Sequence, residues 1–396
     1  MANRRPAVRA VPEPPSIRRR ISRIKESGIR VIANATMGRD DVIPLWFGES
    51  DQPTPDFICE AAAAALRAGD TFYAPNRGKP ELVTTIAEYE NRLYARPITE
   101  DRIVVTCAGM NALMISAELL VDPGDEVICV TPVWPNFLGC VEIMDGHPVE
   151  VPLTPQDGRW HLDLDRLFGS VTARTKAIYL STPGNPTGWM AERDTLEAIL
   201  EFCRHHGLWV VSDEVYARVV YDRDVAPSFL DLAEPDDAVI VVNSFSKSWS
   251  MTGWRLGWVV APATAATMIE RLNEYNVASP AAAAQSAGIT AIRQGEPHVL
   301  EMRGALAQAR DTVMAALGAI DRVQLIRPDA AFYAFFGVDG MTSSTETTWA
   351  LVEQVGVGLA PGDAFGAGGD NYLRICYAKS PDLLESALER LATALQ

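Results

Sequence analysis

Short apolar runs alternate with segments of helical periodicity along most of this chain, up to Val260. The runs Arg102–Thr106 and Glu126–Val130 are strand-like, and Asn111–Leu120 between them has the apolar spacing of a helix. Two strands connected through a helix are parallel, because the helix returns the chain to the end of the sheet where the first strand began. The alternation therefore predicts an α/β fold with a mostly parallel sheet and crossover helices.

The pattern changes after about Glu296, where longer amphipathic segments replace the alternation. Val299–Leu317 and Ser380–Leu395 have helical spacing, and Pro381 suits the first position of the second helix. Between them, Phe332–Phe336 is strand-like. A chain of 396 residues forms two domains or one large α/β domain, and 48% hydrophobic residues support a substantial core.

The net charge of −16 and the pI near 4.8 argue against nucleic acid as the principal partner, because a phosphate backbone requires a basic surface. The amino terminus is locally basic, and we interpret it as a solvated extension; its basic residues are Arg4, Arg5, Arg9, Arg18, Arg19, Arg20, Arg23 and Lys25. No apolar run suits a secretory signal or a membrane span. The cysteines lack CxxC spacing, which indicates reduced thiols in a cytoplasmic protein; they are Cys59, Cys107, Cys129, Cys140, Cys203 and Cys376.

Polar side chains follow three of the predicted strands, at the point where each strand ends. They are Asn185 after 177–182, Asp213 and Tyr216 after 208–212, and Lys247 after 238–242. In doubly wound α/β sheets, ligands bind beyond the carboxyl ends of the strands. We therefore expect these four side chains to project into one crevice.

Lys247 lies in a serine-rich turn, and Arg255 follows it in a glycine-flanked stretch. A desolvated lysine loses its proton and becomes a nucleophile toward an aldehyde, whereas a guanidinium binds phosphate with a planar fork. An exposed basic loop is the alternative. The polar residues at the other strand ends favour a site for pyridoxal phosphate.

Together these motifs resemble those of the fold-type I pyridoxal-phosphate-dependent enzymes of the class I/II aminotransferase family (aspartate/aromatic aminotransferase-like), from about Ile43 to Ala378. The resemblance implies a three-layer large domain at 46–288 and a smaller α+β domain formed by 1–45 and 289–396. It also implies pyridoxal 5′-phosphate as the cofactor, amino-acid and 2-oxo-acid substrates, and a homodimer with shared active sites.

The resemblance assigns a role to each residue around the cofactor ring. Lys247 would bond to the cofactor aldehyde and then act as general acid/base, and Asp213 would keep the pyridine nitrogen protonated. Asn185 and Tyr216 would hydrogen-bond the ring O3′, and Trp134 would stack on the ring. For Tyr216 and Trp134, the alternative is an ordinary core aromatic.

The phosphate is expected in a turn between a strand and a helix, where backbone amides and the helix dipole attract anions. The residues that the resemblance places around it are Ala108, Gly109, Met110, Ser244 and Arg255. By the same resemblance, Tyr73 reaches the phosphate of the neighbouring subunit.

Arg374 resembles the arginine that holds the substrate α-carboxylate with a bidentate fork, beside Gly48 and Asn185. The alternative is a solvent-facing arginine, but the apolar flanks Leu373 and Ile375 favour a buried strand, where an unpaired charge would be costly. None of the 5 histidines falls in a motif, so neither a metal site nor a histidine triad is supported.

The predicted reaction is a ping-pong amino-group transfer between an L-amino acid and a 2-oxo acid, with 2-oxoglutarate as the expected acceptor. Met110 occupies a position where some acid-selective relatives carry a cation. Large neutral or aromatic donors are favoured by an aromatic-rich entrance, formed by Trp46, Phe47, Tyr73 and Trp134. Aspartate and glutamate stay possible donors, because Arg77 or Lys79 could bind their side-chain carboxylate.

Two other functions stay open. Leu45–Asp51 also resembles the carbon–sulfur (cystathionine β-type) lyase branch of the same fold, whereas Met251–Arg255 favours the aminotransferase branch. A non-catalytic cofactor-binding sensor is the second, although no domain of winged-helix length precedes Ile43. Ala330 stands where many relatives carry glycine, which leaves the form of that turn open.

Overall fold

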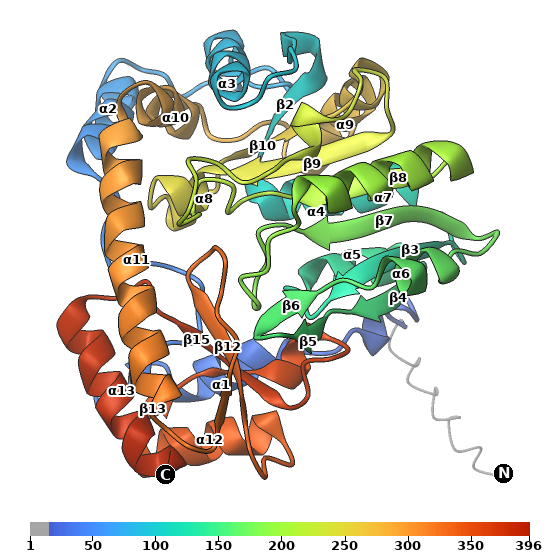
Figure 1. The fold of residues 1–396 in the computed structure, drawn as a ribbon. Helices are drawn as coiled ribbons and strands as arrows, with labels where there is room; N and C mark the ends of the chain where they lie inside the picture. Colours follow the sequence, from blue (N-terminus) through green and yellow to red (C-terminus); the bar gives the residue numbers. More distant parts are fainter. Residues whose placement is uncertain (1–15) are drawn as a thin grey trace, which may run out of the picture.

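The computed structural model describes residues 16–396, so the first part of the basic amino terminus lies outside the described residues (Figure 1). A seven-stranded sheet forms the centre, in the order β2-β10-β9-β8-β7-β3-β4. Its strand pairs are parallel except those of β10, which is antiparallel to both neighbours. The strands are β2 (Ile103–Thr106), β3 (Glu126–Thr131), β4 (His147–Pro152), β7 (Thr175–Ser181), β8 (Trp209–Asp213), β9 (Val239–Ser244) and β10 (Gly257–Val260). The predicted mostly parallel sheet is confirmed.

Both faces of this sheet are covered by helices, which explains why its strands are continuous apolar runs. Successive side chains alternate between the faces: Val104 and Val259 pack on one side, and Val105 and Val260 on the other. The first face carries α4 (Ala108–Leu120), α5 (Asn136–Ile143) and α9 (Ala263–Asn276). The second carries α3 (Pro80–Leu93), α7 (Arg193–His206) and α10 (Ala282–Gln294). The result is a three-layer arrangement (Figure 1).

A second, four-stranded antiparallel sheet lies below the first in Figure 1, in the order β11-β12-β15-β14. Its strands are β11 (Val323–Leu325), β12 (Tyr333–Val338), β14 (Ala360–Pro361) and β15 (Tyr372–Cys376). It shares an apolar core with α11 (Glu296–Gly318), α12 (Ser344–Val355) and α13 (Pro381–Leu395). The helices and the strand expected after Glu296 are therefore confirmed, whereas the domain boundaries at 46–288 stay a prediction.

The amino-terminal segment joins this second unit. The short strand β1 (Ile43–Pro44) pairs in parallel with β13 (Val357–Gly358), and α1 (Gly28–Thr36) packs near β14. Of the basic residues before α1, Arg18 forms an ion pair with Asp145 at 2.7 Å. The remaining elements are α2 (Asp56–Arg67), β5 (Thr154–Gln156), β6 (Arg159–His161), α6 (Leu164–Gly169) and α8 (Phe245–Ser248).

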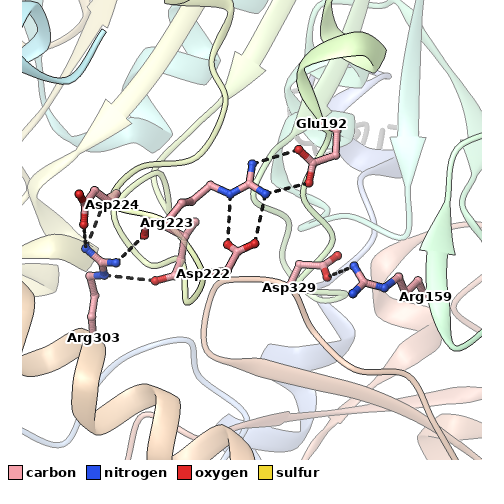
Figure 2. A network of polar contacts seen from close by, with 8 residues as sticks. Arg159, Glu192, Asp222, Arg223, Asp224, Arg303 and Asp329 are labelled. Carbon is pink, nitrogen blue, oxygen red and sulfur yellow. Dashed lines mark hydrogen bonds and ion pairs between the residues drawn. The ribbon is translucent and has the colours of Figure 1, made fainter.

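A polar network connects the two units on one side of the molecule (Figure 2). Arg159 in β6 pairs with Asp329 at 2.9 Å, and Arg223 pairs with Glu192 at 3.0 Å. Arg303 in α11 donates to backbone carbonyls of the loop 220–224, at 3.1 Å for Val220 and 3.3 Å for Asp224. Exposed pairs of this kind add little stability individually. Their effect is to hold the loop that follows Tyr216 against α11.

The turn at Ala330 is tightly packed. The Ala330 backbone N–H donates to the Gly188 carbonyl at 3.0 Å, and Ala331 has a φ of 59°, in the left-handed region. A Cβ at Gly188 would come within 2.8 Å of the Ala330 carbonyl oxygen. The turn without glycine at 330 therefore depends on glycine at 188.

Two findings concern the wider setting of the chain. Across residues 16–396, every helix is too short or too polar to cross a lipid bilayer. All six cysteines are free thiols.

Candidate active site

A cavity of about 590 Å³ lies where the carboxyl ends of the parallel strands face the four-stranded sheet. Twelve positions of the predicted site line it together, so the expectation of one shared crevice is confirmed; they are Gly48, Ala108, Gly109, Met110, Trp134, Asn185, Asp213, Tyr216, Ser244, Lys247, Arg255 and Arg374. Tyr73 is the exception: it does not line the cavity of its own chain, and its side chain is 93% exposed.

Lys247 lies in α8, which begins directly after β9. The Ser244 side chain caps this helix by accepting from the Ser246 backbone N–H at 3.1 Å, which fixes where the lysine leaves the backbone. The Lys247 Nζ donates to the Gly48 carbonyl at 2.5 Å. Burial lowers the pKa of Lys247 to about 8, because desolvation disfavours the charged amine. A lysine of this kind has a far larger neutral, nucleophilic fraction near neutral pH than an exposed one.

Asp213 ends β8 and is buried in the cavity wall. Its carboxylate accepts from the Val215 backbone N–H at 3.3 Å. Burial raises the pKa of Asp213 to about 6, and the nearby Lys247 charge opposes that rise. Among the described residues, no arginine or lysine forms an ion pair with it. A buried, unpaired carboxylate suits a cationic ring nitrogen, which would supply the missing charge.

Arg374 lies in β15 and is only 2% exposed. Its Nη1 donates to Asn185 Oδ1 at 2.8 Å and its Nη2 donates to the Trp46 carbonyl. In the part of the chain that the structure describes, its buried Nε has no hydrogen-bond partner and no carboxylate pairs with the guanidinium. The buried-strand expectation is confirmed. A buried guanidinium without a counter-charge indicates an anionic ligand at this end of the cavity.

Tyr333 in β12 is a site residue that the sequence reasoning did not assign. Its hydroxyl is 2.6 Å from that of Tyr216, and its ring lies 4.6 Å from the Arg374 guanidinium carbon. Burial raises the pKa of both tyrosines, so both are neutral hydroxyls here. A Cβ at Gly48 would overlap the Tyr333 hydroxyl. The strand-like run 332–336 was the available signal, but this unbroken apolar run does not reveal which of its side chains faces the cavity.

The turn that begins α4 also lines the cavity and could hold an anion. Ala108 begins α4 with a φ of 71°, so the first amides of the helix face the cavity beside Gly109. A Cβ at Gly257 would come within 2.8 Å of the Gly109 nitrogen, so only glycine fits beneath this turn. Arg255 is exposed in the cavity wall, and its Nη1 donates to the Thr252 carbonyl at 2.6 Å.

The remaining candidates divide between the cavity and the outside. Trp134 is half-buried in the wall near Met110, whose sulfur lies 3.2 Å from Asn136 Nδ2. Arg77 and Lys79 do not line the cavity of their own chain, because each is held elsewhere. Arg77 pairs with Glu270 at 2.8 Å, and Lys79 pairs with Asp70. The structure thus removes the sequence argument for either as a receptor of a side-chain carboxylate within its own subunit.

The geometry agrees with comparisons to known proteins. The family "Aminotransferase class I and II" matches residues 40–391. The chain is 38% identical to a probable aspartate/prephenate aminotransferase of Aquifex aeolicus, over 90% of this chain and 91% of the relative. It is 33% identical to aromatic-amino-acid aminotransferase 2 of Thermococcus litoralis, over 95% and 97% of the two chains. The structure of Thermus thermophilus aspartate aminotransferase with maleate superposes with a TM-score of 0.89 at 31% identity, covering 96% of this chain and 100% of that one. This chain therefore belongs to the class I and II aminotransferase family and is an aminotransferase of the aspartate/aromatic type.

Proposed function

We propose that this aminotransferase uses pyridoxal 5′-phosphate to move an amino group between an L-amino acid and a 2-oxo acid by a ping-pong mechanism. One observation carries the proposal: a single cavity holds a lysine of lowered pKa, a buried unpaired carboxylate and a buried unpaired guanidinium. When bound, the cofactor supplies an aldehyde that condenses with amines and a ring that accepts the electron pair left when Cα loses its proton.

The residues present fit this cofactor at each of its polar groups. The amides of Ala108 and Gly109, the Ser244 hydroxyl and the Arg255 guanidinium would hold the phosphate at the start of α4. Asp213 would pair with the protonated ring nitrogen, which removes the cost of its buried charge. The cavity therefore combines a turn that can hold an anion with a buried carboxylate, which match the phosphate and the ring nitrogen.

The chain's own groups then divide the proton transfers and the orientation of the substrate. Arg374 would bind the α-carboxylate with its free Nε edge, beside Asn185. Lys247 Nζ would take the proton from the substrate Cα, hold it and later release it, as a base whose pKa of about 8 lies near neutral pH. The Tyr216 hydroxyl, held by Tyr333 at 2.6 Å, and Asn185 would donate to the ring O3′.

For the substrates, we propose aromatic or other neutral amino acids as donors, with aspartate as a further donor and 2-oxoglutarate as the acceptor. The aromatic side chains of Trp46, Phe47 and Trp134 in the wall support a large apolar donor. Relatives that carry aspartate, prephenate and aromatic amino acids in their names support both groups. The resemblance of Leu45–Asp51 remains the one argument for a carbon–sulfur lyase, and the described residues add none for the lyase or the sensor.

We also propose a cytoplasmic homodimer in which Tyr73 reaches the partner's phosphate. Phe72, Tyr73 and Tyr275 are 83%, 93% and 88% exposed, and the segments that carry them are joined by a hydrogen bond from Asn273 to the Asn76 carbonyl at 3.0 Å. Large exposed aromatics on neighbouring segments are typical of a protein–protein interface. A Tyr73→Phe variant that loses phosphate affinity in the dimer would support the shared site.

The proposal is tested by chemistry at Lys247. Borohydride reduction of the holoenzyme, followed by peptide mass mapping, should place a pyridoxyl group on Lys247 and on no other residue. The absorption spectrum of the holoenzyme should then change when an amino donor is added and return when a 2-oxo acid follows. Release of pyruvate and ammonia from cysteine without an acceptor would instead identify a lyase, and a label on another residue would refute the assignment of the site.

A further inference from the structure

The wall of the cavity contains one cation that the proposed function leaves without a task. Four basic side chains line the cavity, and three have roles there: Lys247 at the aldehyde, Arg255 at the phosphate and Arg374 at the α-carboxylate. The fourth is Arg30, in the first turn of α1. It comes from a short amino-terminal helix that carries no recognisable motif, which is why the sequence reasoning passed over it.

Arg30 is oriented but not neutralised. Its guanidinium carbon lies 4.8 Å from the centre of the Phe47 ring, a contact that holds the planar group against the wall. Within residues 16–396, no carboxylate forms an ion pair with it, and its side chain is exposed to the cavity mouth. Glu49, also in the wall, instead lies 3.3 Å from the Thr252 hydroxyl. The Arg30 fork is therefore available to an anion from outside the chain.

The surroundings of Arg30 reinforce its preference for an anion. Ser27, at the amino-terminal end of α1, also lines the cavity, and its side chain does not cap the helix. The first turn of α1 contains no acidic residue, and Glu26 precedes the N-cap Ser27, so the helix dipole at this point favours an anion only modestly. The neighbouring wall residues Ile29, Phe47 and Met110 are apolar. A substrate side chain that extends along these residues would reach the positive charge of Arg30.

We propose that Arg30 binds the second, side-chain carboxylate of dicarboxylic substrates, such as glutamate, aspartate and their 2-oxo acids. This inference rests on the proposed function, because the first carboxylate must already be held by Arg374. Arg30 takes the role for which Arg77 and Lys79 were candidates. Neutral and aromatic donors would pack their side chains on Phe47 and Trp134 without using the Arg30 charge, so one cavity serves both substrate classes.

The test compares two ligands of equal length that differ by one carboxylate. Isothermal titration calorimetry on the holoenzyme measures the Kd of succinate and of butyrate for the wild type and for Arg30→Gln, Arg30→Lys and Arg23→Gln. Arg23 is the matched control, because it is an exposed arginine of the same amino-terminal segment that does not line the cavity. A neutral, polar side chain at an exposed position leaves folding nearly unchanged.

Arg30→Gln should weaken succinate binding by about tenfold to a hundredfold, the range for one charge-assisted interaction, and should change butyrate binding by less than about twofold. Arg30→Lys should lie between the wild type and Arg30→Gln, since it keeps the charge but loses the fork. Arg23→Gln should match the wild type. Unchanged succinate binding in Arg30→Gln, an equal loss for both ligands, or an equal loss in Arg23→Gln would overturn the proposal.

Kinetics separate this proposal from the proposed function. In Arg30→Gln, kcat/KM should fall for glutamate and should stay the same for phenylalanine. A wild-type holoenzyme that transfers no amino group from any donor would refute the proposed function, whereas the calorimetry would still report on Arg30. Active transfer with an unchanged glutamate-to-phenylalanine ratio in Arg30→Gln would refute only the role of Arg30.

Discussion

Replacing Gly48 with alanine should disturb the site through Tyr333. The new Cβ would overlap the Tyr333 hydroxyl and would lie 2.9 Å from Cζ of the ring. Tyr333 is fully buried in the cavity wall, so its ring can move aside only by giving up packing contacts and entering the cavity. Overpacking of this kind costs about 1–3 kcal/mol. If the ring shifts, its 2.6 Å hydrogen bond to Tyr216 is also lost, which adds about 1 kcal/mol.

We therefore expect Gly48→Ala to lower the free energy of unfolding by about 2–4 kcal/mol. Tyr333→Phe removes the overlapping oxygen, so Gly48→Ala should cost at least about 1 kcal/mol less in that background than in the wild type. Urea titrations of the wild type, both single variants and the double variant measure this coupling. KM for an amino donor should rise in Gly48→Ala, because the Gly48 carbonyl also holds Lys247 Nζ.

The double-mutant cycle makes the reasoning easy to refute. If the two substitutions are additive within about 0.5 kcal/mol, the Tyr333 hydroxyl is not what excludes a side chain at Gly48. Gly28→Ala is a suitable control, because the added Cβ would meet only Ala364, at 3.1 Å, away from both tyrosines.

Three further predictions follow from charges and contacts in the structure. Asp213→Asn should slow amino transfer by about 100-fold or more, as for other preorganised electrostatic partners, with a much smaller loss of cofactor affinity measured by fluorescence titration. Because the pKa of Lys247 is lowered from 10.5 to about 8, the cofactor-free protein should bind pyridoxal phosphate faster as the pH rises through about 8. The buried lysine charge destabilises the folded state below that pH, so the Lys247 contribution to stability should increase between about pH 8 and 10.5. A binding rate that rises only near pH 10.5 would contradict this prediction. Arg303→Met should lose its hydrogen bonds to the Val220 and Asp224 carbonyls, so limited proteolysis should cut the loop 220–226 faster than in the wild type.

The central sheet could be predicted from the sequence because its strands are buried on both faces and appear as unbroken apolar runs. The direction of β10 could not be predicted in this way. Its apolar residues, such as Trp258 and Val260, read like those of any parallel strand, and its antiparallel pairing follows from the short connection through α8. Pattern alone shows that a segment is a strand, but the length and path of the connection decide which way it runs.

The same distinction applies to the site. Residues at the ends of parallel strands, such as Asp213 and Lys247, were predicted together because the topology brings those ends together. Arg374 was predicted from the smaller sheet only through its motif, whereas Tyr333 and Arg30 lie in no motif, and their positions depend on how two separately built units face each other. Arg77 and Lys79 looked available as isolated cations, and their partners Glu270 and Asp70 are visible only in three dimensions.

The cavity wall is shared by two sheets that have no backbone hydrogen bonds to each other. Asp213 belongs to the larger sheet and Lys247 to α8 directly after it, whereas Arg374 and Tyr333 belong to the smaller sheet. A slight rocking of one sheet on the other would therefore shift Arg374 relative to Lys247 and would also move the hydrogen bond that joins Tyr333 to Tyr216. Under the proposed function, mutations along the seam would change the grip on the substrate more than the phosphate contacts at the start of α4.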